Sequence, residues 1–366
     1  MKNKLLIFLL FAICHAEVIA QKKVICHSVG DFQEGMAAIQ VDEKWGFIDT
    51  LGNVVIPPQF ISSFIVNKAP SFCEGLAAVI EQSSQQMIYI NKKGEIAFDQ
   101  KYIRAYNFHE GIAFVEPTVF SDFKVLINKK GENITERFRC SFISDYSNNR
   151  ARIDNRSFID RKGKIAVKHQ YTAVQSFSNG LAAVQLNYGK WGFIDTLENV
   201  KVPFQFTNEP KSFSDYRAFV QGSNNKWGVI DTTGNLIVEP VYDQVFPFSS
   251  GIAVVSRMDD KWKNTFYLID IEGKVVREYP QNMNNKETII INTGFTEGLA
   301  VASKGSKRGL IDTKGNVKVN YMYSELRPVS GGMAYFEKWD EKTKKTTKGF
   351  IDKSGKEVIV LEQPKF

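Results

Sequence analysis

The chain has 366 residues, of which 43% are hydrophobic, 13% are aromatic and 24% are charged. This share of apolar and aromatic residues excludes an intrinsically disordered chain, and this density of charge excludes a protein made mostly of membrane-spanning segments. The formal net charge is +7, and the length is sufficient for a large hydrophobic core.

Residues 1–20 have the layout of a secretory signal peptide. Lys2 and Lys4 give a basic start, Leu5 to Ile13 form an apolar run, and cleavage is predicted after Ala20. An uncleaved anchor is the alternative, but the apolar run is shorter than the ~20 residues that a bilayer-spanning helix needs. We therefore expect residues 21–366 to be exported to the periplasm, the cell surface or the medium, with no transmembrane segment.

From Phe32 onwards the chain repeats a pattern with a mean period of about 38 residues. In each repeat an Asp or Asn, here called the marker residue, follows a short apolar run, and a Gly recurs before most of the preceding apolar runs. The marker residues are Asp49, Asn91, Asn128, Asp160, Asp195, Asp231, Asp270, Asp312 and Asp352. The sequence thus predicts that residues 21–366 form a single array of about nine repeat units.

Each unit is predicted to contain three short antiparallel strands. In the first unit these are Met36–Val41, Trp45–Asp49 and Val54–Ile56, which are apolar and rich in strand-forming residues. The marker residue and the Gly three positions later are typical of a hairpin turn, because the Asp side chain accepts from nearby backbone N–H groups and Gly adopts positive φ. No segment of residues 21–366 has a sustained helical period, so we predict an all-β fold.

The middle strand of each unit is apolar on both faces, so neighbouring units are expected to cover both sides of it. Gly46, Gly192 and Gly228 would permit close approach of the neighbouring backbone. Propellers usually close with about 4–8 blades, so nine uneven units favour an open superhelical stack. A closed, propeller-like ring is the alternative.

The motif KWGFID begins at Lys44 and again at Lys190, and KWGVID begins at Lys226. With the turn that follows, these segments resemble bacterial WG (KWG) repeats. The signature residues are Trp45, Gly46, Asp49, Trp191, Gly192, Asp195, Trp227, Gly228 and Asp231. The resemblance implies a secreted or envelope-associated β-repeat protein and implies no activity. It weakens in residues 146–177, which lack the Trp, and at Glu198, which replaces the turn Gly.

No catalytic, metal-binding or cofactor motif is found in the sequence. The recurring Asp is interpreted as structural, because Asn91 and Asn128 keep its hydrogen bonds without its charge. Cys26, Cys73 and Cys140 have irregular spacing that indicates neither a disulfide framework nor a zinc site, and His109 and His169 are interpreted as surface variation. We therefore expect no enzymatic activity, no cofactor and no bound metal.

Basic charge is concentrated in residues 137–168 and 301–366, each with a net charge of +6. The second block contains a long hairpin loop from Lys338 to Lys348 and, one unit earlier, the loop that begins at Lys304. If neighbouring units present these loops along one edge, they form a strip that attracts a polyanion. The predicted contact residues are Lys304, Lys307, Arg308, Lys338, Lys342, Lys344, Lys345 and Lys348. Solvated loops without a ligand are the alternative.

These observations favour a secreted, non-enzymatic β-repeat protein whose extended surface binds a protein or an acidic polymer of the cell envelope. Nucleic acid is not an expected partner for an exported protein. One alternative is a loop-based hydrolase or glycan-processing enzyme, which should show a pocket with unpaired carboxylates at non-repeating positions. The other alternative is a purely structural spacer. The sequence leaves the oligomeric state open.

Overall fold

The computed structural model describes residues 21–62, 69–117, 123–281 and 287–364, so the predicted signal peptide lies outside the described residues. Every named element of the described part is a β-strand. The strands are β1 (Lys22–Ile25), β2 (Ser28–Val29), β3 (Met36–Val41), β4 (Lys44–Asp49), β5 (Val54–Ile61), β6 (Leu76–Ile80), β7 (Met87–Asn91), β8 (Arg104–Ala105), β9 (Ile112–Glu116), β10 (Phe123–Asn128), β11 (Phe138–Arg139), β12 (Ala151–Ile153), β13 (Ser157–Ile159), β14 (Ala173–Val174), β15 (Leu181–Gln185), β16 (Trp191–Asp195), β17 (Val200–Phe206), β18 (Ala218–Gln221), β19 (Trp227–Ile230), β20 (Leu236–Tyr242), β21 (Gln244–Val245), β22 (Ile252–Met258), β23 (Asn264–Asp270), β24 (Val275–Pro280), β25 (Ile289–Ile291), β26 (Leu299–Lys304), β27 (Lys307–Asp312), β28 (Val317–Tyr323), β29 (Glu325–Leu326), β30 (Met333–Asp340), β31 (Lys345–Asp352) and β32 (Glu357–Glu362).

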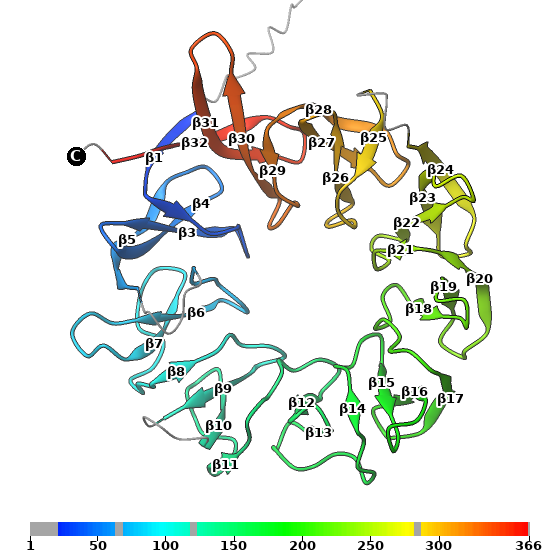
Figure 1. Ribbon diagram of the computed structural model, residues 1–366. Coiled ribbons are helices and arrows are strands. Elements are labelled where there is room, and N and C mark those ends of the chain that lie inside the picture. The colour runs from blue at the N-terminus through cyan, green and yellow to red at the C-terminus, as the bar shows by residue number, and fades with distance from the viewer. Residues whose placement is uncertain (1–20, 63–68, 118–122, 282–286, 365–366) are drawn as a thin grey trace, which may run out of the picture.

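The strands form small, mostly antiparallel sheets that follow one another around a closed ring, which is a β-propeller (Figure 1). The ring closes where β1 pairs in parallel with β32, from Lys22 opposite Ile359 to Ile25 opposite Glu362. The first strand of the chain therefore completes the last sheet, whose order is β1-β32-β31-β30-β29. The predicted open superhelical stack is wrong. The first unit also packs against the last through Phe32 and Phe350, so neither end keeps an uncovered face from which an open stack could continue.

The described strands belong to eight hydrogen-bonded sheets, one of which contains two successive units joined through the single pair Ile61–Ile80. All nine marker residues begin the same turn, in which the marker N–H donates to the carbonyl oxygen four positions later. Several sheets have a fourth strand of only two residues, such as β14, which pairs with β15. The prediction of three strands per unit is wrong for these sheets, because two residues are too few to produce an alternating pattern.

The signature glycines contact the third strand of their own unit. A Cβ on Gly46 would lie 2.4 Å from the Ile56 carbonyl oxygen, at the point where the pairing of β4 with β5 is interrupted by a bulge. Gly192 and Gly228 meet the carbonyl oxygens of Val202 and Val238 in the same way. The expectation that these glycines admit the backbone of a neighbouring unit is therefore wrong, because the β-bulge within the unit already brings the backbone close.

The hydrophobic core lies between successive sheets around the ring. A phenylalanine at the start of six units is buried against an aromatic ring of the preceding unit. The ring pairs are Phe32–Phe350 (4.9 Å), Phe47–Phe72 (4.8 Å), Tyr89–Phe108 (5.0 Å), Phe158–Phe177 (4.6 Å), Phe193–Phe213 (4.8 Å) and Phe219–Phe248 (5.4 Å) between ring centroids. Because Phe32 of the first unit packs on Phe350 of the last, the same contact that joins neighbours also closes the ring.

Closure of the ring by β1 is testable through the two faces of that strand. Val24 is buried in the core beside Phe350 and Ile359, whereas the neighbouring Ile25 is 56% exposed. We expect Val24→Asp to lower the free energy of unfolding by more than about 3 kcal/mol, because it buries an unpaired charge. Ile25→Asp is the matched control and should change stability little. Similar urea unfolding curves for the two variants would contradict closure by β1.

The three signature tryptophans differ in burial, so their truncation should differ in cost. Trp191 is buried in the core cluster that includes Phe193 and Phe213, whereas Trp45 and Trp227 are partly exposed. We expect Trp191→Ala to destabilise the protein by about 3–5 kcal/mol and Trp45→Ala to cost less, because only the first leaves a fully enclosed cavity. Urea unfolding of both variants checks this order, which equal losses would refute.

Candidate functional site

A tight turn opens each unit and faces the opening at the centre of the ring (Figure 1). In the first unit, Gln33 and Met36 exchange two backbone hydrogen bonds, while Glu34 and Gly35 have φ of 50° and 81°. These central turns are residues 33–36, 73–76, 109–112, 147–150, 178–181, 214–217, 249–252, 296–299 and 330–333. Seven of these nine turns place a side chain that hydrogen-bonds the central turn of the next unit.

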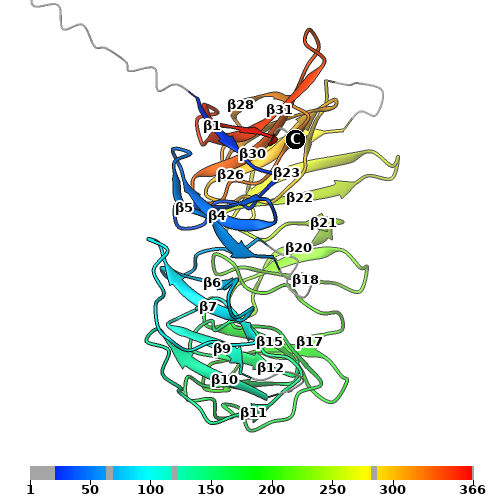
Figure 2. The same cartoon turned by 90° about the vertical axis from the view of Figure 1, so that its left-hand side faces the viewer.

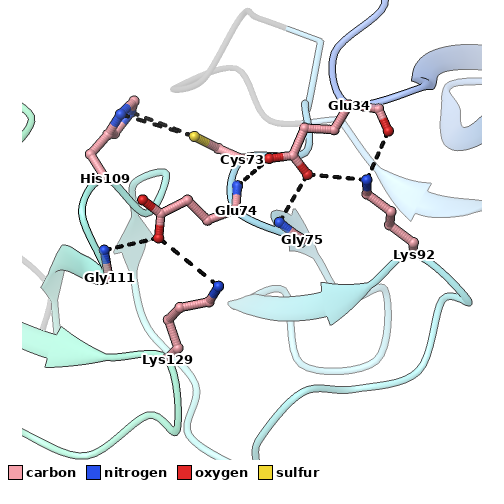
Figure 3. Close-up of polar contacts among 8 residues, drawn as sticks. All are labelled: Glu34, Cys73, Glu74, Gly75, Lys92, His109, Gly111 and Lys129. Atoms are coloured by element: carbon pink, nitrogen blue, oxygen red, sulfur yellow. Dashed lines mark hydrogen bonds and ion pairs between the residues drawn. The ribbon is translucent and has the colours of Figure 1, made fainter.

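Carboxylates and amides link successive central turns around the ring. Figure 3 shows that Glu34 accepts from the N–H groups of Glu74 (2.5 Å) and Gly75 (2.9 Å), and that Glu74 accepts from the N–H of Gly111 (2.9 Å). The same link recurs as Glu110 to Asn149, Asn148 to Gly180, Asn179 to Tyr216, Asp215 to Gly251 and Glu297 to Gly332. The recurring polar residues of these turns therefore hold neighbouring units together.

Lysines that follow marker residues neutralise several of these carboxylates. Lys92 Nζ lies 3.2 Å from a Glu34 carboxylate oxygen and donates to the Glu34 carbonyl oxygen at 2.7 Å (Figure 3). Lys353 pairs in the same way with Glu297 at 2.8 Å. Burial alone would raise the pKa of Glu34, but the Gly75 and Glu74 N–H groups and Lys92 outweigh it and hold that pKa below its ordinary value.

A cysteine, a histidine and an aspartate from successive units meet beside the central turns. Cys73 Sγ lies 3.9 Å from Nε2 and 4.0 Å from Nδ1 of His109, and His109 Nε2 lies 3.2 Å from Asp145 (Figure 3 shows the first two residues). The order resembles that of a nucleophile, a base and an orienting acid. The sequence interpretation treated Cys73 and His109 separately. Both precede a Glu-Gly step, so the sequence showed that they occupy equivalent positions in adjacent units, but it did not show that they touch.

The surroundings of Cys73 do not activate its thiol. Burial first, and then the charges of Glu34, Glu74 and Asp145, raise the pKa of the Cys73 thiol, whereas a nucleophilic cysteine needs a lowered pKa. The next two backbone N–H groups, of Glu74 and Gly75, already bind the Glu34 carboxylate. They are thus not free to stabilise an oxyanion, which acyl-transfer chemistry requires.

A second polar cluster is buried between β9 and β10. Glu116 and Lys124 are 8% and 7% exposed and form an ion pair at 3.1 Å, and Arg104 lies 3.7 Å from Glu116. A cavity of about 290 Å³ adjoins the pair. The Glu116 carboxylate is thus neutralised by two cations. Among the described residues, no group of three or more His, Cys, Asp or Glu side chains is arranged to hold a metal ion.

The signature aspartates cap their own turns. Asp49 Oδ1 accepts from the N–H groups of Leu51 (2.9 Å) and Asn53 (2.8 Å), and Asp195 and Asp231 make the equivalent pairs of bonds. Burial would raise the pKa of Asp195 and Asp231, but hydrogen bonds from the Asn199 and Thr233 side chains, together with these N–H groups, lower it. Trp227 lies under the ammonium group of Lys211, which is 5.1 Å from the ring centroid. In all of these contacts the signature residues stabilise the repeats themselves.

The predicted polyanion contact lies on hairpins. Residues 338–348 belong mostly to β30 and β31, which extend to Asp340 and from Lys345, so the predicted long loop is wrong and only residues 341–344 form the turn. Cross-strand pairing continues to Asp340–Lys345 because both strands are long. This hairpin projects beyond the ring (Figures 1 and 2).

Most of the predicted contact cations are already paired with carboxylates. The ion pairs are Lys304–Glu287, Arg308–Glu325, Lys338–Glu357, Lys344–Glu341 and Lys348–Glu337. Lys307, Lys342 and Lys345 form no ion pair with any carboxylate of the described residues. The structure therefore narrows the free positive charge in this region to three of the eight predicted lysines and arginines.

The lowered pKa of Glu34 predicts how acid affects the ring. A carboxyl group whose pKa is lower in the folded state adds stability above its unfolded pKa, near 4.5, and loses this contribution as the pH falls through the folded pKa. We expect Glu34→Gln to lose about 1 kcal/mol at pH 7 and to show a flatter decline below pH 4.5. Glu278→Gln, an exposed glutamate, is the control. Identical pH profiles for Glu34→Gln and the wild type would contradict the role given to this link.

Comparison with solved structures finds similar chains at low sequence identity. Similar solved structures include BamB from Moraxella catarrhalis (8% identity, 79% of this chain and 94% of that chain, TM-score 0.41). Others are the dihydro-heme d1 dehydrogenase NirN (10%, 92% and 75%, 0.43) and the WD40 β-propeller domain of Doa1 (10%, 72% and 86%, 0.29). No functionally curated protein matches the chain significantly in sequence.

The WG-containing repeat family model matches seven segments of the chain. The matched residues are 24–45, 45–81, 89–116, 157–191, 191–226, 227–262 and 309–342. Together they span more than half of the 366 residues, as the resemblance seen in the KWGFID motifs predicts. The chain belongs to the WG-containing repeat family.

Proposed function

We propose that this protein is an exported, non-enzymatic propeller that binds an anionic polymer of the cell envelope. The observation that carries the proposal is the projecting β30–β31 hairpin, whose turn and adjoining residue expose Lys342 and Lys345 without a carboxylate partner in the described chain. A cation on a projecting hairpin adds little to folding stability, because it contacts no other unit. It is well placed to attract a polyanion.

Neighbouring units place similar side chains at the same end of their strands. We call the turns between the first two long strands of a unit the tip turns; they include residues 259–263, 305–306 and 341–344. Tip turns lie at the opposite end of the strands from the central turns, because each first long strand begins at a central turn and ends at a tip turn. Trp262 is 83% exposed in its tip turn, between Lys261 and Lys263. Exposed aromatic and cationic groups on successive tip turns are typical of a binding surface.

The site geometry supports binding more than catalysis. Cys73 has a raised thiol pKa, and Glu116 is neutralised by Lys124 and Arg104. Neither site supplies the unpaired carboxylate at a non-repeating position that the enzyme alternative requires. Export rests on the predicted signal peptide, and among the described residues no helix is long and apolar enough to cross a membrane.

Co-sedimentation with the envelope fraction of the source cells tests the proposal. We expect binding at low salt that is lost at high salt, because contacts between exposed charges are screened. The triple variant Lys307→Glu, Lys342→Glu and Lys345→Glu should reduce binding by at least about tenfold.

The matched control reverses three exposed lysines in the marker turns of these two units and of the unit before them, at the other end of the strands: Lys274→Glu, Lys314→Glu and Lys356→Glu. It carries the same change in net charge and should bind like the wild type. If both variants lost binding equally, net charge alone would explain the effect, and the tip-turn site would be refuted. Binding that survives high salt would indicate an apolar protein partner, and no binding at all would favour the spacer.

A further inference from the structure

The unit that departs most from the repeat also leaves a large cavity. Its strands β12 and β13 have three residues each, whereas the corresponding strands β15 and β16 of the next unit have five each. The short hairpin therefore ends before the tip turn of the next unit. A cavity of about 740 Å³ opens there, between the 154–156 turn, residues 165–172 and the next tip turn at 187–188.

Positive charge dominates the lining of this cavity. Arg139, Arg156 and Lys168 contribute cations, and the lining carboxylate is Asp154. Asp154 Oδ1 is occupied by hydrogen bonds from the Ser141 N–H (2.8 Å), the Ser141 hydroxyl (2.7 Å) and the Phe142 N–H (3.0 Å). Arg156 and Lys168 are exposed and form no ion pair with any described carboxylate. The side chains of Arg156 and Lys168 are thus available to bind an anionic group.

One wall of the cavity is held in place by Glu198 of the next unit. This residue replaces the turn glycine, and it adopts the φ of 68° that the turn requires. Its carboxylate accepts from the N–H groups of Lys168 (2.7 Å) and His169 (3.0 Å), and it lies 2.9 Å from His169 Nδ1 and 3.2 Å from the Tyr171 hydroxyl. The two departures from the repeat pattern, the short unit and Glu198, therefore meet at one wall. Such fixing of the wall lowers the entropic cost of binding.

We propose that this cavity binds an acidic oligosaccharide. Its volume is in the range of ligand sites, about 300–1,000 Å³. Tyr188, 82% exposed at the rim, offers an aromatic face for the apolar face of a sugar ring, and Gln170 and Asn187 offer amides for hydroxyl groups. Arg156 and Lys168 would bind the acidic group. A simple anion would contact only Arg156 and Lys168. Recognition of an acidic peptide does not require an aromatic ring next to amide groups, whereas a sugar ring uses both.

The inference shares with the proposed function an anionic partner but uses different residues, in the other basic block of the sequence. Isothermal titration with acidic trisaccharides, carrying uronate, sulfate, phosphate or sialate groups, tests it against neutral trisaccharides of the same linkage. We expect an acidic trisaccharide to bind and its neutral counterpart to bind at least tenfold more weakly. Arg156→Gln with Lys168→Gln should weaken binding at least tenfold, and Tyr188→Ala should weaken it severalfold.

The control variant Lys162→Gln with Lys164→Gln removes the same charge at the marker turn of the same unit and should bind like the wild type. Absence of binding to every acidic trisaccharide, or unchanged binding in the Arg156 and Lys168 double variant, would overturn the inference. Equal affinity for hexaglutamate would assign the cavity to an acidic peptide instead, and full competition by inorganic phosphate would assign it to a simple anion. The Lys307, Lys342 and Lys345 variant should keep trisaccharide affinity, so failure at either site is recognised separately.

Discussion

Contact between aromatic rings of successive units is the interaction on which the rest of this structure depends. Each small sheet is apolar on both faces and would expose both to water if it stood alone. A phenylalanine at the start of a unit, such as Phe72 or Phe213, inserts against the aromatic residue of the unit before it, Phe47 or Phe193. Each sheet is therefore stabilised by packing on its neighbours in the ring. The contact of Phe32 with Phe350 joins the first and last units in the same way.

This constraint separates the two ends of the strands. At the central end, turns from neighbouring units lie within hydrogen-bonding distance. Their polar side chains therefore already have partners in the next unit, as Glu34 has in the N–H groups of Glu74 and Gly75 (Figure 3). Even the Cys73–His109 contact belongs to this inner region, where carboxylates oppose a thiolate. At the tip end, the turns make fewer links to neighbours. Their length and charge can vary without disturbing the aromatic contacts, and both proposed binding sites lie there.

Irregular units provide the chemistry that a regular array lacks. A group present in every unit serves the scaffold, as the marker aspartates do by capping their turns. The short β12–β13 hairpin removes material from one unit, and Glu198 uses a position reserved for glycine to fix the adjoining wall. A positive φ costs a residue other than glycine of order 1 kcal/mol, and the hydrogen bonds of the Glu198 carboxylate offset that cost. The same departures from the repeat pattern thus produce the cavity.

The sequence by itself determined the longer strands, the marker turns and the family, because each depends on contacts within about 20 residues. Asp49 accepts hydrogen bonds from the N–H groups of Leu51 and Asn53. The strands Met36–Val41 and Lys44–Asp49 are close in the sequence and pair as a local hairpin. Only the tertiary structure decided that the array closes, since the pairing of β1 with β32 joins the chain ends and has no periodic signal. The meeting of Cys73 with His109 and the cavity beside Glu198 were decided there too. Both depend on the rotation between successive sheets, which is set by packing and not by any single residue.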